Sequence, residues 1–291
     1  MKKSILIIGG DSFIATNFIN SCQNLFNFKI VSRKKTHFTN AYIIKNIFNI
    51  PDLLFKKVDV VINFCAIVHK KNVPKSIYKN INYELPVFLF NKSTKQRVKH
   101  FIQMSTISVY GRQRVIKFNS KLNPENSYGF YKLKTDNYIL NSNNDIIVSC
   151  IRPPMIYGAN APGNMKNLIS LANTNLPLPF KNIDNKLAFI NIKNLVHFLN
   201  IVIDKELSDV LIPTDKKLTS TKEIIRTVRK ILGRKERLII MPNSLKMIIK
   251  TIFPNLYKKL FESLIVECNV DDSIFTPTHT ISQGLEDCLK Q

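Results

Sequence analysis

The sequence has no apolar run that reaches the ~20 residues needed to cross a bilayer. A short apolar stretch opens the chain, but Gly9-Gly10-Asp11 ends it without a small-residue cleavage site. A signal peptide needs such a site, so we interpret residues 4–8 as a first β-strand. The sequence also lacks internal repeats and a long low-complexity linker. These absences predict a cytoplasmic globular protein with no transmembrane segment.

Cysteine is scarce, and no two cysteines have the spacing of a CxxC motif. The five cysteines are scattered along the chain. An odd, scattered set predicts free thiols in a reducing compartment rather than a disulfide framework. No cluster of cysteine and histidine has the spacing of metal ligands, so we expect no metal ion.

Acidic residues are few: 20 Asp and Glu against 43 Lys and Arg give a net charge of +23. Such a charge suggests nucleic-acid binding, but the lysines are spread along the whole chain and no nucleic-acid-binding motif is present. We therefore expect a basic surface that serves an anionic substrate, and no nucleic-acid partner. Weak attraction to an anionic membrane is an alternative, because residues 245–261 mix lysines with large apolar side chains. A substrate-domain helix packed on one face explains that stretch as well.

The first half of the chain alternates short apolar runs with longer amphipathic stretches. Near-continuous apolar runs predict buried parallel strands, and the amphipathic stretches predict the helices that cover them. The expected strands are residues 4–8, 28–32, 58–64, 100–104 and 146–151, and the expected helices are residues 13–23, 77–93 and 126–140. This alternation predicts an α/β fold with a Rossmann-type, doubly wound parallel sheet.

The second half has a different pattern. Prolines mark loops, as in residues 176–179. Ser220 and Glu223 have the spacing of a helix capping box. We interpret this half as a smaller, irregular α/β substrate-binding region. The expected division is a cofactor domain over residues 1–155, with a returning segment near 187–205, and a mainly substrate-binding region over residues 156–291.

A glycine turn follows the first expected strand and opens a helix. This context suits a dinucleotide-binding turn, in which N–H groups at a helix N-terminus receive a pyrophosphate. Ser12 and Ala15 stand where a GxxGxxG pattern has glycine, but both are small enough for close approach of the backbone. The residues expected to contact the cofactor here are Gly9, Gly10, Asp11, Ser12, Phe13 and Ile14.

The second expected strand ends with Ser32-Arg33, and two lysines follow. An NAD site usually has an acidic residue at this position, where it binds the ribose hydroxyls. A hydroxyl and three cations suit a 2′-phosphate instead. The sequence therefore favours NADP(H), read by Ser32 and Arg33, with NAD(H) as the alternative.

Tyr128 and Lys132 form a YxxxK step downstream of Thr106. Residues i and i+4 share one face of a helix, so both side chains can point at one substrate, and Thr106 can join them from a strand end. A nearby ammonium lowers the pKa of a phenol from about 10 toward neutrality. We expect these three residues to catalyse carbonyl–alcohol chemistry.

Several motifs, in this order along the chain, resemble the extended short-chain dehydrogenase/reductase family. The similarity is to its NAD-dependent epimerase/dehydratase group, which acts on nucleotide sugars. The glycine turn resembles TGGxGFIG. The other matching segments are residues 61–66 (VIHLAA, along the cofactor), 80–82 (the NVxGT helix start), 105–111 (SSxxVYG), 128–132 (YGxSK), 151–158 (LRPxxVYG), and Pro277 with Gly284-Leu285 (P…GL). The departures are Ser12 and Ala15 for glycine, Asn63 for histidine and Tyr131 for serine.

The resemblance implies further site residues. Cys65, Ala66 and Pro153 are expected beside the cofactor, and Lys132 on the nicotinamide ribose. The candidate substrate-binding residues are Ser108, Asn82, Asn164, Lys166 and Lys186. The last three are expected to contact the nucleotide diphosphate, and Asn82 is expected to hold local backbone or a water near the site. A homodimer through the two long helices that flank the central strands is typical of the family.

Within the family, residues 157–164 and 176–179 look most like the 4-ketoreductases and 4-epimerases of O-antigen sugar clusters. The resemblance, with the basic loop, favours NADPH-dependent reduction of a UDP-4-keto-6-deoxy-N-acetylhexosamine. A UDP-sugar 4-epimerase that recycles tightly bound NAD is the alternative. A 4,6-dehydratase has Asp-Glu after the catalytic threonine, where this chain has Ile107-Ser108. A third alternative, a non-catalytic NADP(H)-binding sensor, is disfavoured because such proteins commonly lose the tyrosine or the lysine.

Overall fold

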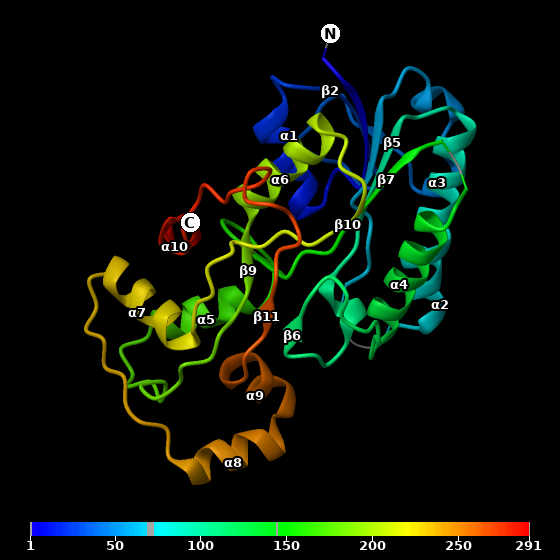
Figure 1. Cartoon of the computed structure of the whole chain (residues 1–291). Coiled ribbons are helices and arrows are strands. Elements are labelled where there is room, and N and C mark those ends of the chain that lie inside the picture. The colour runs from blue at the N-terminus through cyan, green and yellow to red at the C-terminus, as the bar shows by residue number, and fades with distance from the viewer. Residues whose placement is uncertain (1, 69–72, 144, 291) are drawn as a thin grey trace.

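The computed structural model describes residues 2–68, 73–143 and 145–290, and its centre is a parallel sheet of seven strands (Figure 1). In spatial order the strands are Asp209–Leu211 (β10), Ile147–Ile151 (β7), His100–Met104 (β5), Val60–Asn63 (β4), Ser4–Ile8 (β1), Asn27–Ser32 (β2) and Tyr42–Ile43 (β3). The strands β4 and β5 are buried along their whole length. Burial on both faces accounts for the apolar run 60–62 in β4, and in β5 it also encloses the polar residues His100 and Gln103.

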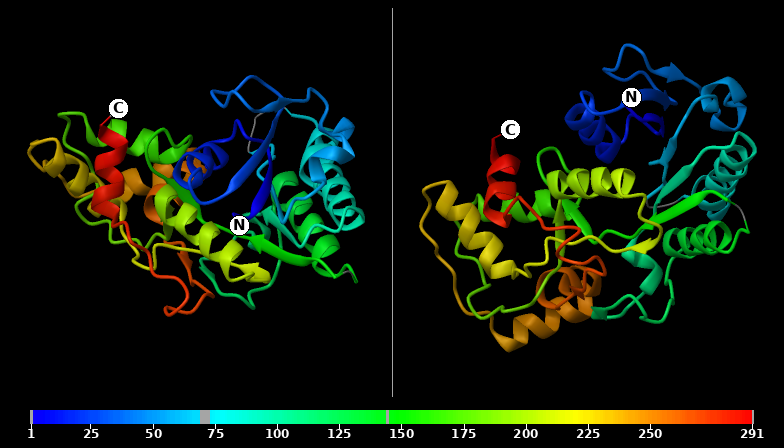
Figure 2. Two further views of the ribbon diagram at one scale, coloured as in Figure 1. Left: turned by 90° about the horizontal axis from the view of Figure 1, so that it is seen from above. Right: turned by 45° about the horizontal axis from the view of Figure 1, so that its top comes forward.

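Helices cover both faces of the sheet (Figure 2). On one face, α1 (Phe13–Cys22) contacts α6 (Ile192–Asp204), and their apolar side chains share a core with β1 and β4. On the other face, α3 (Leu85–Lys95) contacts α4 (Ser127–Leu140) over a second core. The sheet therefore lies between two layers of helices, which is the doubly wound arrangement that the sequence predicts.

The second half adds a smaller region beyond the carboxyl ends of the strands. Two short parallel pairs cross it, Met155–Tyr157 (β8) with Phe189–Asn191 (β9), and Val115–Ile116 (β6) with Ile265–Val266 (β11). A third core joins α5 (Asn164–Ala172), α7 (Thr221–Ile231) and α10 (Ile281–Leu289). The remaining elements are α2 (Lys75–Lys79), the π-helical turn Asn80–Glu84 (η3), the 3₁₀ turns Ile47–Asn49, Asp52–Phe55 and Ile107–Tyr110, and the helices α8 (Asn243–Ile252) and α9 (Pro254–Phe261).

The α/β class and the Rossmann-type sheet are confirmed, and so is the capping box at Ser220, whose side chain accepts from the Glu223 N–H while Glu223 accepts from the Ser220 N–H. One expected helix is wrong in detail, because a π-helical turn divides residues 77–93 into α2, η3 and α3. Strands of two or three residues, such as β3 and β10, were not predicted. Alternation and apolar runs cannot be recognised over so few positions.

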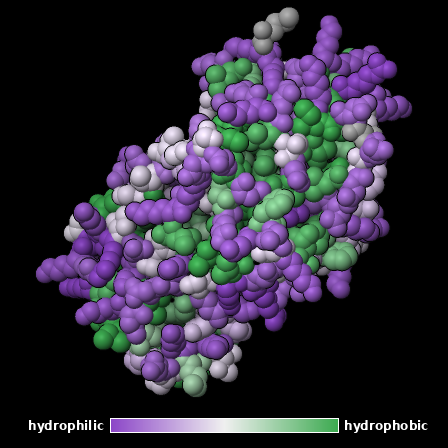
Figure 3. Space-filling model, in the orientation of Figure 1, coloured by the Kyte–Doolittle hydropathy of each residue, from purple (hydrophilic) through white to green (hydrophobic). Residues whose placement is uncertain are grey.

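Two negative findings concern the described ranges only. Within them, no helix is both long enough and apolar enough to span a membrane. The same residues hold no group of three or more His, Cys, Asp or Glu side chains arranged to bind a metal ion. Hydrophilic side chains cover much of the face seen in Figure 3, with hydrophobic patches between them.

His100 begins β5 and is buried, although it is a titratable residue. Its Nε2 lies 2.6 Å from the Ser149 Oγ of the neighbouring strand β7, and its Nδ1 has no hydrogen-bond partner among the described residues. Burial lowers the pKa of His100 from 6.5 to about 4. The folded protein therefore holds this imidazole in its neutral form at neutral pH.

The pH dependence of stability tests this burial. Below pH 6.5 the unfolded chain takes up a proton at this histidine and the folded chain does not, so protonation favours unfolding. The free energy of unfolding should fall by about 1.4 kcal/mol per pH unit from this source, ~3 kcal/mol in all by pH 4. Urea titrations of the wild type and His100→Gln across that window measure it. The variant should show a shallower slope, and the exposed control His37→Gln should keep the wild-type slope. Equal slopes for all three proteins would contradict the account.

Candidate active site and cofactor pocket

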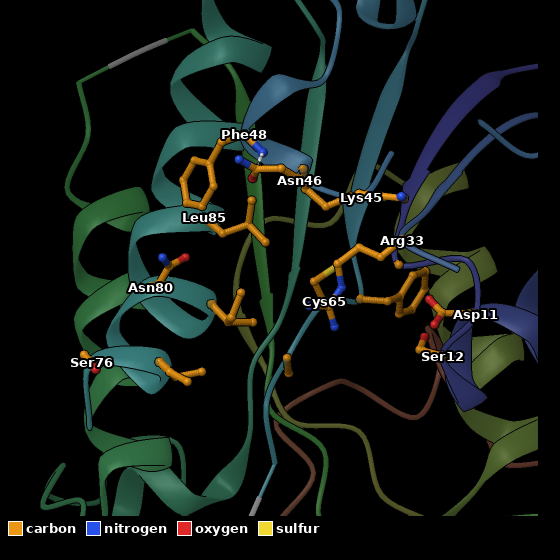
Figure 4. A pocket seen from close by; sticks show the side chains of 16 residues that line it. Asp11, Ser12, Arg33, Lys45, Asn46, Phe48, Cys65, Ser76, Asn80 and Leu85 are labelled. Carbon is orange, nitrogen blue, oxygen red and sulfur yellow. Dashed lines mark hydrogen bonds between the residues drawn. The ribbon is translucent and has the colours of Figure 1, made fainter. Parts of the chain in front are cut away.

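A pocket of about 580 Å³ opens at the carboxyl ends of β1, β2 and β4. It is lined by side chains from the glycine turn, the end of β2, the end of β4 and the helices that follow (Figure 4). The lining residues are Gly9, Asp11, Ser12, Arg33, Lys45, Asn46, Ile47, Phe48, Phe64, Cys65, Ala66, Ser76, Ile77, Asn80, Ile81 and Leu85. The carboxyl edge of a parallel sheet is where nucleotides bind in folds of this kind.

The glycine turn is tightly built. Gly9 has a φ of +88°, and a Cβ there would lie 2.9 Å from the Sγ of Cys65. A Cβ on Gly10 would lie 2.3 Å from the Ile30 side chain. Ser12 replaces the usual glycine and serves as the N-cap of α1, since its Oγ accepts from the Ala15 N–H at 3.2 Å. The turn thus presents a helix N-terminus to the pocket, where an anion is stabilised by the first-turn N–H groups.

Ser32 and Arg33, the two residues predicted to bind a 2′-phosphate, differ in their position relative to the pocket. Arg33 is exposed and lines the pocket. Ser32 is fully buried, its Oγ accepts from the Lys34 N–H at 3.3 Å, and it does not line the pocket. The role given to Ser32 is therefore corrected: its hydroxyl shapes the loop after β2. Lys45, which the sequence had not indicated, brings a second cation to the pocket instead.

The pocket wall that includes residues 45–48 was not predicted from the sequence. Asn46 caps a 3₁₀ turn, with its Oδ1 accepting from the Phe48 N–H at 3.2 Å. The strand before it has only two residues, so no periodicity marks the segment. Together the glycine cradle, the helix N-terminus, the cations and the pocket volume fit the adenosine diphosphate part of a nicotinamide dinucleotide.

Thr106, Tyr128 and Lys132 come from the elements that the sequence predicted. Thr106 follows β5, and its Oγ1 accepts from the Ser108 N–H at 3.1 Å. Tyr128 lies in the first turn of α4 and forms a hydrogen bond with Thr106. Lys132 is fully buried one turn later, and its Nζ donates to the Met104 carbonyl oxygen at 2.7 Å. The three side chains therefore converge at the end of β5.

The electrostatics of this group differ from the expectation. Burial raises the pKa of Tyr128 to about 12, against the lowering effect of the hydrogen bond with Thr106 and with a smaller raising effect from Asp136. Burial also lowers the pKa of Lys132 to about 8. The sequence predicted that Lys132 would lower the pKa of the phenol. Burial was not readable from the spacing, and it makes Tyr128 a neutral phenol at neutral pH in the absence of ligands.

Asp136 was missed by the sequence reasoning, although its spacing from Lys132 is again i+4. It is fully buried and accepts from the Ser105 Oγ at 2.8 Å and from the Arg152 Nε at 2.9 Å. Arg152 also donates from Nη1 to the Tyr110 hydroxyl at 3.0 Å. Burial raises the pKa of Asp136, and Arg152 is the first of the groups that oppose this. Tyr128, Lys132 and Asp136 thus form one column on α4, anchored at its base by an ion pair.

Asn82 holds local backbone in the structure. It is fully buried in the π-helical turn, where its Oδ1 accepts from the Ile67 N–H and its Nδ2 donates to the Ile67 carbonyl, both at 2.9 Å. Its own carbonyl oxygen accepts from the Thr135 Oγ1 at 2.6 Å. Asn82 therefore ties the segment after β4, which carries Cys65 and Ala66, to α4.

The other predicted residues have the following places. Cys65 and Ala66 line the pocket, and Pro153 is buried with its carbonyl accepting from the Ile107 N–H at 3.3 Å. Ser108 is half-buried, and its Oγ accepts from the Thr106 Oγ1 at 3.2 Å. Lys166 is exposed on α5, and Asn164 begins that helix, but its side chain lies outside the described part of the structure. Lys186 lines a separate cavity of about 450 Å³ near the start of α7.

The sequence pattern of the "NAD dependent epimerase/dehydratase family" matches residues 5–210, which span the glycine turn, the three converging side chains and the returning helix α6. This chain belongs to that family. The resemblance found in the sequence motifs is thereby confirmed.

Two relatives are nucleotide-sugar or sugar-diphosphate 4-epimerases. The UDP-glucose 4-epimerase of Vibrio cholerae is 30% identical over 246 residues, which is 78% of this chain and 75% of that protein. The N-acetyl-alpha-D-glucosaminyl-diphospho-ditrans,octacis-undecaprenol 4-epimerase of Escherichia coli O157:H7 is 26% identical over 180 residues, 58% of this chain and 54% of that protein.

Solved structures show the same fold. The UDP-glucuronic acid 4-epimerase of Bacillus cereus, in complex with NAD, superimposes with a TM-score of 0.78 at 18% identity. The match covers 99% of this chain and 97% of that one. Its extent includes the smaller second region as well as the Rossmann-type sheet.

Asn82→Ala tests the positioning role of this residue. The change removes two hydrogen bonds to Ile67 and leaves partly buried backbone groups unpaired, so the free energy of unfolding should fall by about 1–3 kcal/mol. Because Cys65 and Ala66 lose their fixed place, the affinity for nicotinamide dinucleotide should fall about tenfold. Urea denaturation and a binding titration measure these effects, with the exposed Asn137→Ala on α4 as control. Unchanged affinity in Asn82→Ala would remove the positioning role.

Proposed function

We propose that this protein is a nucleotide-sugar 4-epimerase that uses bound NAD. The observation that carries the proposal is the convergence of Thr106, Tyr128 and Lys132 at the end of β5. Lys132 lies close enough to Cys65, a lining residue of the nucleotide pocket, for the two to interact electrostatically. The proton-handling groups therefore lie at one end of the pocket that fits the dinucleotide.

Residues of this chain would remove the proton from the C4 oxygen of the sugar and return it. Tyr128 takes the proton from the C4 hydroxyl and gives it back to the C4 carbonyl oxygen, and Thr106 donates a hydrogen bond to the same oxygen. When bound, the nicotinamide supplies the site that accepts the C4 hydride and returns it. As a neutral phenol Tyr128 is ready for the return step. For the forward step its pKa must fall, which the ammonium of Lys132 accomplishes when it turns from the Met104 carbonyl toward the phenol.

Membership in the family and the two 4-epimerase relatives support epimerisation over simple reduction. Reduction of a UDP-4-keto-6-deoxy-N-acetylhexosamine by NADPH, in O-antigen synthesis, is the second candidate. It is favoured by Arg33 and Lys45, two cations that line the pocket and suit a 2′-phosphate. A non-catalytic NADP(H) sensor is disfavoured, because Thr106, Tyr128 and Lys132 are all retained.

Further proposals concern the substrate and the assembly. UDP is the proposed carrier, and a polyprenyl diphosphate carrier is tested beside it because the Escherichia coli relative acts on one. Asn164, Lys166 and Lys186 are proposed to contact the diphosphate.

Residues 1–155 with 187–205 would bind the cofactor, and the rest of residues 156–291 would bind the sugar. We also propose a cytoplasmic homodimer formed through α3 and α4.

The purified full-length protein, without added cofactor, should interconvert UDP-glucose or UDP-N-acetylglucosamine with its C4 epimer. A polyprenyl-diphosphate-linked sugar forms a parallel arm. Tyr128→Phe should lower kcat ~10²–10⁴-fold, because the proton shuttle is lost, while the amount of NAD released from denatured protein stays the same. Product is measured by chromatography and the cofactor by absorbance.

Two results would overturn the proposal in different ways. No epimerisation of any substrate, with stoichiometric oxidation of NADPH by UDP-2-acetamido-2,6-dideoxy-4-hexulose, would establish the ketoreductase. Full activity in Tyr128→Phe would remove Tyr128 from the chemistry. The matched control is Tyr138→Phe, which changes a phenol on the outer side of the same helix, where the hydroxyl donates to Asn91.

A further inference from the structure

The helices α8 and α9 expose an unusual number of large apolar side chains. No residue of either helix is buried. Five residues of this segment, which we name the α8–α9 surface, are large, apolar and exposed: Leu245, Ile248 and Ile252 on one face of α8, Phe253 between the helices, and Leu256 on α9. Ile252 is 61% exposed and Phe253 is 57% exposed, so these side chains are not the partly covered edge of a core. A contiguous apolar patch on a soluble protein marks a site of interaction.

The chain is tied to the rest of the protein before α8 and at the end of α9. Arg229 is buried and donates to the carbonyl oxygens of Glu236 and Arg237, which fixes the chain that leads to α8. At the other end, the Leu260 carbonyl at the end of α9 accepts from the Thr221 Oγ1 at 2.7 Å. The ring of Phe261 stacks on Phe180 at 5.5 Å between centroids. The chain is therefore anchored on both sides of the helix pair, while the α8–α9 surface itself stays exposed.

All the charged side chains between residues 237 and 261 are positive. Between Glu236 and Glu262 the chain has no acidic residue and five cations. The cations are Arg237, Lys246, Lys250, Lys258 and Lys259. Apolar side chains among lysines on a helix pair are the pattern of a helix that lies in a membrane interface. A second copy of this chain would bring the same five cations against each other, which disfavours self-association through this surface.

The position of the helices suits contact with a flat surface. Figure 1 shows α8 and α9 at one end of the molecule, the end toward which the strands of the sheet run, and in the right-hand view of Figure 2 α8, in orange, lies at the lower edge. Nothing in the described chain covers the α8–α9 surface, since its residues stay exposed in the folded protein.

We propose that the α8–α9 surface docks this protein on an anionic phospholipid bilayer. The apolar side chains enter the headgroup region, and the lysines beside them lie at the level of the phosphates. Docking is peripheral and reversible, because the segment is too short and too charged to cross the bilayer. The inference goes beyond the proposed function, and it requires no particular sugar substrate.

Co-sedimentation of the full-length protein with vesicles tests this directly, without nucleotide or sugar present. At low salt the protein should bind vesicles that contain 30% phosphatidylserine in phosphatidylcholine (a composition that we choose for the assay), and should bind pure phosphatidylcholine far less. Ile248→Ser with Ile252→Ser should weaken binding at least ~10-fold through loss of inserted apolar groups. Lys246→Gln with Lys250→Gln should weaken it up to ~30-fold, the effect of two lysines at an anionic surface.

The controls change matched side chains elsewhere. Leu25→Ser with Leu53→Ser removes two exposed leucines, and Lys95→Gln with Lys205→Gln removes two exposed lysines. Both control proteins should bind vesicles as the wild type does. Absence of binding at low salt, equal binding to neutral vesicles, or equal loss in the controls would overturn the proposal. So would a change in oligomeric state, measured by light scattering, when only the α8–α9 surface is altered, because the occupant would then be a second copy.

Discussion

The buried ion pair between Asp136 and Arg152 is the interaction on which the candidate site depends. Asp136 lies on α4, Arg152 follows β7, and the hydroxyl of Ser105, at the end of β5, completes the contact. Both charged side chains are almost wholly removed from water. A buried charge that loses its partner costs about 3–5 kcal/mol, so neither residue is free to change alone. One contact therefore fixes a helix against the ends of two adjacent strands.

This ion pair also determines where the residues proposed for catalysis lie. Lys132 lies one turn and Tyr128 two turns before Asp136 on α4, so the ion pair fixes the positions of the ammonium and the phenol. Thr106 follows Ser105, which shares the anchor. The same buried contact therefore fixes the positions of Tyr128, Lys132 and Thr106. Two other contacts fix the pocket beside them. Gly9 lies close to Cys65, and the side chain of Asn82 forms two hydrogen bonds with the backbone of Ile67.

The sequence predicted the parts of this arrangement that are local. Apolar runs marked the central strands, and the i to i+4 spacing placed Tyr128 and Lys132 on one helix face. It did not predict what depends on three-dimensional packing. Ser32 was assigned to the cofactor because it follows a strand, but its hydroxyl turns back to the Lys34 N–H. The direction of the pKa shift of Tyr128 was wrong, because burial raises this pKa by more than the hydrogen bond with Thr106 lowers it. Lys45 was missed because a two-residue strand leaves no pattern.

The central claim is that the Asp136–Arg152 pair positions Tyr128 and Lys132. A double-mutant cycle of Asp136→Asn, Arg152→Met and the double variant measures it, with the free energy of unfolding and kcat recorded for each protein. The account predicts a coupling of ~2 kcal/mol in stability and a loss in both single variants that falls on kcat more than on KM. Stabilities that add within about 0.5 kcal/mol, with kcat unchanged in the single variants, would contradict it.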